Sequence, residues 1–128
     1  MSATLGMLSL LVRDYDEAIA YYTRTLGFTL IEDTVLSETK RWVVIAPGAD
    51  GARLLLAKAA NETQHAFVGN QTGGRVFLFL YVSDFDATYE RYHAAGVHFI
   101  GAPRQEEYGK VVVFEDFYGN RWDMIERQ

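Results

Sequence analysis

The chain contains one segment twice, about half its length apart, and this repeat constrains the fold more than any other feature. The run 7–16 returns as 77–86, and each copy continues through a helix-like stretch to a glycine and a short apolar strand. The offset between the copies is 70 residues over the first strands and 69 at Gly27 and Gly96. The second copy therefore lacks one residue in its helical stretch. A repeat of this period predicts two similar structural units.

Each copy predicts the order strand, helix and three further strands. Alternation in the first strand is typical of a β-strand with two different faces. Asp14 and Glu17 have the spacing of a helix capping box, and Gly27 is placed to end that helix. We expect the later strands at 28–33, 41–46 and 53–57 in the first copy, and in the second copy a helix over 85–95 with strands at 76–82, 97–100, 110–115 and 121–125.

The length of 128 residues predicts one compact α+β domain spanning 1–128. Within it, the repeat predicts one module over 5–60 and a second over 75–128. The polar, glycine-containing segment 61–74 is the expected linker between them.

Charge and cysteine content exclude several classes of function. The net charge is −5 and no run of Lys or Arg is present, so we expect no nucleic-acid partner. The absence of cysteine excludes disulfides, thiol nucleophiles and thiolate metal sites. The first residues carry no basic segment and no long apolar segment follows, which predicts neither a signal peptide nor a membrane span. A cytoplasmic location is the default expectation.

The two faces of each repeated first strand differ in chemistry. Even-numbered positions are aliphatic in both copies and are expected to pack on the helix. Odd-numbered positions should point away from it, and two such sheets would leave a concave, aromatic-lined space. The alternative is that these residues pack against one another as a core. They are Met7, Ser9 and Leu11 in the first copy, and Phe77, Phe79 and Tyr81 in the second.

Two signatures in this order extend over nearly the whole chain. One is Leu10-x-Val12-x-Asp14-x-Asp16-x-Ala18 with Tyr21-Tyr22 and Leu26-Gly27-Phe28, and the other is the acidic and glycine-containing run 115–123. With these residues the chain resembles the vicinal oxygen chelate superfamily, which includes glyoxalase I, extradiol dioxygenases and bleomycin-resistance proteins. The resemblance implies two tandem βαβββ modules that form an open, barrel-like mixed sheet. It also implies a homodimer.

The resemblance also implies where a metal would be bound. Metalloenzymes of that superfamily commonly use a His or Gln on the first strand and a carboxylate on the fourth. A His on the fifth strand and a carboxylate on the eighth complete the set. These positions fall on Met7, 54–56, Phe77 and Asp123, of which only the last is a suitable ligand. We therefore expect no metal and no other cofactor, and we interpret His65, His93 and His98 as surface residues.

Asp123 is the strongest candidate for a functional side chain. An aspartate in an apolar strand needs a partner or a raised pKa, because burying an unpaired charge is costly. It could accept a hydrogen bond from a ligand, neutralise a basic ligand, or act as a general acid or base. The alternative is a structural ion pair with Arg121, Arg41 or Arg75.

The other candidates are expected to bind a ligand. Arginine beside an indole can bind a carboxylate or stack on a planar ligand, although Arg41 could equally be an exposed charge and Trp42 a core residue. The expected ligand-binding residues are Met7, Ser9, Leu11, Arg41, Trp42, Phe77, Phe79, Tyr81, Tyr108 and Arg121.

The sequence favours a protein that binds a small organic molecule in this cleft without metal, as the bleomycin-resistance branch does. One alternative is a metal-independent enzyme that uses Asp123 as acid or base, with Tyr81 or Tyr108. Another is a divalent-metal lyase or dioxygenase whose ligands lie at displaced positions. A third is a module whose concave face docks a partner protein.

Overall fold

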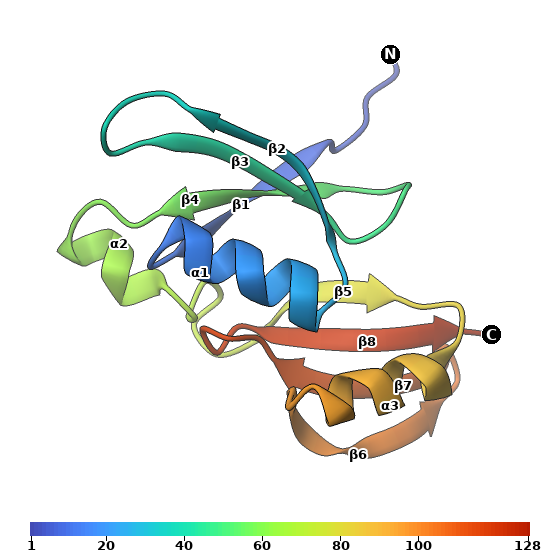
Figure 1. Ribbon diagram of the computed structural model, residues 1–128. Helices are drawn as coiled ribbons and strands as arrows, with labels where there is room; N and C mark the ends of the chain where they lie inside the picture. Colours follow the sequence, from blue (N-terminus) through green and yellow to red (C-terminus); the bar gives the residue numbers. More distant parts are fainter. The chain divides into compact units, whose positions relative to one another are not determined.

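A computed structural model describes residues 1–128. The chain divides into two compact units, Met1–Val68 and Gly69–Gln128. The first unit contains β1 (Met7–Val12), α1 (Tyr15–Ala20), the π-helical turn η1 (Tyr21–Thr25), β2 (Thr29–Val35), β3 (Arg41–Ala46), β4 (Arg53–Lys58) and α2 (Glu62–Phe67) (Figure 1). The second unit contains β5 (Val76–Tyr81), α3 (Phe85–Ala94), β6 (His98–Glu106), β7 (Gly109–Glu115) and β8 (Arg121–Arg127).

The two units have the same sheet topology. The first sheet has the strand order β1-β4-β3-β2 and the second has the order β5-β8-β7-β6. In each, the first and last strands are parallel and the other neighbours are antiparallel. The predicted α+β class and the two βαβββ modules are confirmed, and neither sheet closes into a barrel.

Helix α1 begins directly after Asp14, the predicted cap, and Asp84 caps α3 in the same way. The Oδ2 atom of Asp14 accepts a hydrogen bond from the Glu17 amide at 2.8 Å, and Oδ1 of Asp84 accepts one from the Ala87 amide at 3.1 Å. Such side chains satisfy amide groups that the first helical turn leaves without partners. No helix in the chain is long and apolar enough to cross a membrane.

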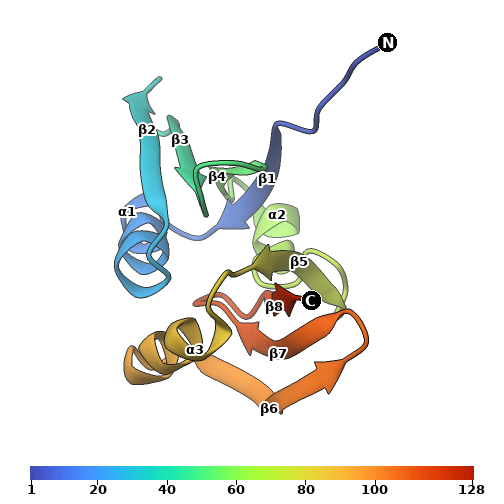
Figure 2. The ribbon, with the colours of Figure 1, turned by 90° about the vertical axis from the view of Figure 1, so that its right-hand side faces the viewer.

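The core of each unit lies between its sheet and its main helix. On β1 the even-numbered Leu10 and Val12 are fully buried, as expected for the face that packs on α1. Figure 2 shows α3 lying against one face of the second sheet, where Phe114 and Trp122 are buried and their rings stack with centroids 5.6 Å apart. The opposite face of each sheet is therefore the one available for other contacts.

The single-residue difference between the repeats is found in η1. The amide of Leu26 bonds to the carbonyl of Tyr21, five residues earlier, at 3.2 Å. A π-helical turn accommodates one extra residue within a helix. Helix α3 of the second unit is α-helical throughout and is one residue shorter than α1 and η1 together.

Two elements differ from the expectation. Strand β6 continues to Glu106 instead of ending at residue 100, because a register shift after Ile100, with Gly101 at φ +77°, lets pairing with β7 resume. Helix α2 forms within 61–74, which the sequence suggested only as a linker. It begins at Asn61, whose Oδ1 accepts from the Gln64 amide at 2.9 Å.

Candidate functional site

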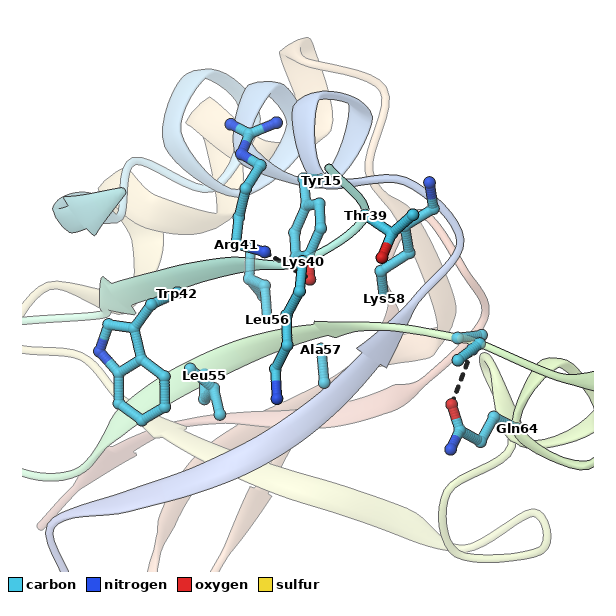
Figure 3. A pocket seen from close by; sticks show the side chains of 12 residues that line it. Tyr15, Thr39, Lys40, Arg41, Trp42, Leu55, Leu56, Ala57, Lys58 and Gln64 are labelled. Atoms are coloured by element: carbon cyan, nitrogen blue, oxygen red, sulfur yellow. Dashed lines mark hydrogen bonds between the residues drawn. The ribbon is translucent and has the colours of Figure 1, made fainter. Parts of the chain in front are cut away.

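A cavity lies in the first unit, where β3 and β4 separate. Their ladder covers only Val43–Ile45 against Leu54–Leu56, so the strands diverge beyond Trp42 and Ala57. The resulting space, here called the first-unit cavity, has a volume of about 660 Å³ (Figure 3). This size is typical of small-molecule sites. Its lining residues are Tyr15, Thr39, Lys40, Arg41, Trp42, Leu55, Leu56, Ala57, Lys58, Ala59, Ala60 and Gln64.

The first-unit cavity combines an apolar floor with basic side chains. Leu55 and Ala57 from β4 form part of the floor, and the half-buried indole of Trp42 stands at one side. Figure 3 shows the Lys40 side chain extending over the cavity between Trp42 and Ala57, whereas Lys58 lies near Thr39. The lining contains no Asp or Glu.

Arg41 lies at this cavity, but its guanidinium is already engaged by carboxylates. Nη2 and Nε bond to the two oxygens of Asp33 at 2.7 and 3.1 Å, and Nη1 bonds to Asp16 at 3.0 Å. The hydrogen bond from Arg41 lowers the pKa of Asp33, and the same bond raises the pKa of Arg41. The guanidinium also lies over the Tyr15 ring, 5.1 Å from its centroid. Few of its donors remain available for a ligand.

A second cavity lies on the face of the second sheet that points away from α3. It has a volume of about 270 Å³ and is called here the second-unit cavity. On this face Phe79 pairs with Asp123 and Tyr81 with Ile125 across the β5–β8 ladder. The cavity is lined by Phe79, Tyr81, Tyr108, Asp123, Ile125 and Arg127, and its three aromatic side chains are about half exposed.

Asp123 is the buried polar group of the second-unit cavity. The residue is 9% exposed, and its Oδ1 atom has no hydrogen-bond partner. Burial raises the pKa of Asp123, and the positive charge of Arg104 opposes that shift. No ion pair includes Asp123, and Arg121 donates instead to the Gly74 carbonyl at 3.4 Å. The structural ion pair considered from the sequence is therefore not formed.

The turn before β8 holds this strand in register. Asp116 is buried and its carboxylate accepts hydrogen bonds from the Tyr118 amide, the Asn120 side chain and the Trp122 indole, all at 3.0 to 3.2 Å. The Trp122 indole donates a hydrogen bond to Asp116, and the Trp122 side chain points to the α3 side of the sheet. Alternation along the strand then places Asp123 on the opposite side, in the second-unit cavity.

The structure places the predicted site residues in four groups. Arg41 and Trp42 line the first-unit cavity. Phe79, Tyr81, Tyr108 and Asp123 line the second-unit cavity. Phe77 and Arg121 border a hollow of about 20 Å³, too small for a ligand. Met7, Ser9 and Leu11 line neither cavity, although Ser9 and Leu11 pair with Leu55 and Ala57 of the first-unit cavity.

Sequence reasoning missed Lys40, Lys58 and Gln64 as lining residues of the first-unit cavity. They come from the β2–β3 turn, the end of β4 and α2. No motif links them, because the divergence of β3 from β4 is what brings them to one cavity. The one available signal was the helix-capping Asn61, which would have indicated a helix after β4 and placed Gln64 in its first turn.

The donor set around Asp123 does not fit a divalent metal ion. Nowhere in the chain do three or more His, Cys, Asp or Glu side chains come together as a group that could hold one. The second-unit cavity offers Asp123 only aromatic, aliphatic and arginine neighbours. Divalent ions in proteins need several oxygen, imidazole or thiolate ligands.

Known proteins share this fold over nearly the full length of the chain. Residues 4–124 match the model of the Glyoxalase/Bleomycin resistance protein/Dioxygenase superfamily. An uncharacterized protein of Shewanella frigidimarina (strain NCIMB 400) is 50% identical over 128 residues, covering 98% of this chain and 95% of that protein. The crystal structure of UcmS2 is 32% identical with a TM-score of 0.85, covering 98% and 99% of the two chains. TnmS3, an antibiotic binding protein from Streptomyces sp. CB03234, is 26% identical with a TM-score of 0.78, covering 100% and 98%.

Proposed function

Since the chain belongs to the Glyoxalase/Bleomycin resistance protein/Dioxygenase superfamily, as its sequence predicted, we propose that it binds a small organic molecule without a metal ion. The observation that supports this most directly is the second-unit cavity, where a buried carboxylate oxygen without a partner lies beside three half-exposed aromatic rings. The proposed ligand is planar or aromatic and presents a hydrogen-bond donor to Asp123.

The unpaired Oδ1 atom of Asp123 would orient the ligand by accepting a hydrogen bond from it. A buried acceptor without a partner costs about 1–3 kcal/mol, and a ligand N–H or O–H group would remove that cost. Phe79, Tyr81 and Tyr108 expose apolar ring surface that a planar ligand would cover. A ligand held in this way needs one directional hydrogen bond and a broad apolar contact, which is the usual composition of a small-molecule site.

Sequestration is favoured over metal-dependent catalysis by the donor chemistry of the chain. The positions where metalloenzymes of the family place ligands hold Met7 and Phe77 in the repeated first strands. Neither side chain is a suitable ligand for a divalent ion. TnmS3, which has the same fold and 26% identity, is an antibiotic binding protein, and this supports binding without turnover.

A metal-independent enzyme is the second candidate, and one observation favours it. Burial raises the pKa of Asp123, which brings its proton exchange nearer to neutral pH than that of an ordinary aspartate. Acid or base catalysis benefits from such a shift. Tyr81 and Tyr108 line the same cavity and carry hydroxyl groups that could hydrogen-bond a substrate.

Thermal-shift and tryptophan-fluorescence titrations with planar aromatic and cationic compounds, each with and without EDTA, test the proposal. We expect saturable binding that EDTA does not change, that Asp123→Ala weakens about tenfold or more, and that Phe79→Ala also weakens. Glu90→Ala removes an exposed carboxylate from the same unit and is the matched control.

Three results would contradict the proposal or replace it. A complete lack of saturable binding across the panel would contradict it. Stoichiometric binding of a divalent ion, lost in Asp123→Ala, would require a metal site instead. Turnover of a bound compound that persists in EDTA and disappears in Asp123→Asn would favour the enzyme over simple binding.

The proposal includes a homodimer and a cytoplasmic location. The strand orders leave β1 and β2 at the edges of the first sheet and β5 and β6 at the edges of the second. Edge strands with unpaired backbone groups favour association unless they are covered. Sedimentation of the purified protein tests the dimer, and fractionation of expressing cells tests the location.

A further inference from the structure

We propose that the first-unit cavity binds a planar organic anion, with the ring against Trp42 and the acidic group held by Lys40 and assisted by Lys58. This inference goes beyond the proposed function, which depends on Asp123 in the second unit. It rests on the shape, the charge and the hydrogen-bond donors of the first-unit cavity.

The shape of the cavity suits a flat ligand. Because β3 and β4 pair only over Val43–Ile45 and Leu54–Leu56, the space between the diverging strands is open beside the Trp42 indole. Leu55 and Ala57 provide an apolar floor next to it. Aromatic rings stack in offset arrangements on such surfaces, and the large indole contributes most of the contact.

The charge of the cavity is positive in a protein whose net charge is −5. Three of its lining residues are basic and none is acidic. Arg41 is neutralised by Asp33 and Asp16, but Lys40 and Lys58 form no ion pair. An adjoining hollow of about 280 Å³ contains Asp14 and Glu38, and the Asp14 carboxylate is engaged as the N-cap of α1. Neither ammonium group forms an ion pair with Glu38 or with any other carboxylate.

The polar groups of the cavity are mainly donors. The Oε1 atom of Gln64 accepts from the Ala60 amide at 2.7 Å, which leaves its NH₂ group to donate (Figure 3). The Tyr15 hydroxyl accepts from the Arg41 amide at 3.2 Å and keeps its own proton to donate. A ligand rich in acceptors, such as a carboxylate or sulfonate, complements these groups, whereas a cationic ligand would be repelled by Lys40.

A matched pair of dyes tests the inference. One is 8-anilino-1-naphthalenesulfonate, and the other is N-phenyl-1-naphthylamine, which has the same ring system without the sulfonate. We expect the sulfonate to bind the folded protein with one site in the first unit, more tightly than the neutral dye and less tightly as salt is raised.

Substitutions identify the groups responsible. The contacts of the sulfonate with the two lysines would be exposed ion pairs, which are individually weak. We therefore expect Lys40→Gln to weaken sulfonate binding about three- to fivefold, Lys58→Gln about twofold, and the double variant about tenfold. Binding of the neutral dye should change by less than about twofold in these variants. Trp42→Ala should weaken both dyes, with Trp42→Phe as the milder variant if the alanine variant does not fold. Arg24→Gln makes the same change in net charge at an exposed helical position outside the cavity and should change neither.

The experiment separates this inference from the proposed function. If the double lysine variant binds the sulfonate as tightly as the parent protein, the inference is wrong. It is also wrong if Asp123→Asn alters sulfonate binding and Trp42→Phe does not, although the second-unit site would then be supported. Loss of compound binding in Asp123→Ala, together with normal sulfonate binding, supports both.

Discussion

Two buried aspartates, seven residues apart, are stabilised very differently. Asp116 accepts hydrogen bonds from backbone and side-chain donors of the turn before β8, including the Trp122 indole. Asp123 is buried to a similar degree, yet its Oδ1 atom has no partner. The hydrogen bonds of Asp116 stabilise the fold, whereas the unpaired oxygen of Asp123 destabilises it. This contrast supports a functional role for Asp123 and a structural role for Asp116.

The contrast predicts opposite effects on stability. Asp116→Ala leaves several buried donors unpaired and should lower the free energy of unfolding by about 2–4 kcal/mol. Asp123→Asn removes a poorly solvated charge and should leave that free energy unchanged or raise it. Urea unfolding followed by circular dichroism measures both. A large loss of stability in Asp123→Asn would show that its carboxylate has a structural partner.

The same reasoning predicts how two carboxylates change stability with pH. The pKa of Asp123 is raised by burial, so the folded protein binds its proton more readily than the unfolded chain does. Its unfavourable contribution therefore grows as pH rises from the ordinary value of 3.8 through the raised value. The pKa of Asp33 is lowered by Arg41, so its favourable contribution is present above 3.8 and is lost as pH falls through the lowered value.

Urea unfolding at several pH values measures these contributions. The stability of Asp123→Asn relative to the parent protein should be greatest near neutral pH and should decline toward pH 3. Asp33→Asn should be less stable than the parent near neutral pH, with the difference shrinking toward pH 3. An Asp123→Asn difference that does not vary with pH would contradict the raised pKa.

At the scale of elements, the repeat in the sequence was sufficient for the order of strands and main helices. Alternation at 7–12 and 77–81, with Asp14 and Asp84 as helix caps, depends on local chemistry that a single sequence displays. The cavities depend on where pairing stops. The gap beside Trp42 exists because β3 and β4 pair over three residues only, and nothing local in either strand indicates that limit.

The candidate residues illustrate the same limit. The burial of Asp123 was predictable, because an aspartate within an apolar strand is conspicuous in sequence. Lys40 and Lys58 were not, since exposed lysines at strand ends are ordinary until the fold places them at one cavity. Arg41 shows the opposite case, because only the structure reveals that Asp33 and Asp16 already engage its guanidinium.

The turn η1 explains the single-residue difference between the repeats and allows a direct test. Tyr22 and Leu26 are both buried, and the extra residue between them is accommodated by the π-helical bond from Leu26 to Tyr21. Deletion of the exposed Arg24 would restore the spacing of the second unit. Leu26 would then take the position equivalent to Ala95, which is exposed.

We expect the deletion to preserve the fold and to cost about 2–4 kcal/mol, close to the cost of Leu26→Ala, because both remove one leucine from the core. The combined variant should cost little more than either change alone, since residues that act through one contact are not additive. Thermal unfolding of the three variants decides this. Full additivity would show that the deletion acts through the backbone and not through Leu26.

The whole molecule presents an edge strand that is unusual in its exposure. All seven residues of β2 are exposed, and they include Leu30, Ile31 and Val35. Natural edge strands are commonly protected by charges, bulges or covering segments. β2 has a register shift between Leu30 and Glu32 and acidic residues at Glu32 and Asp33, but Asp33 is paired with Arg41 and the apolar side chains stay exposed. An apolar edge of this kind favours pairing with another copy of the chain.

We therefore predict a homodimer in solution that depends on β2. Ile31→Lys or Val35→Lys should raise the dissociation constant of the dimer at least about tenfold, because each substitution puts two lysines, one from each copy, into one apolar interface. Leu5→Lys changes an exposed apolar residue outside the strand and should have no effect. Sedimentation velocity over a range of protein concentrations measures these constants. A monomeric parent protein would contradict the dimer, whereas an unchanged dimer in both β2 variants would place its interface on another strand.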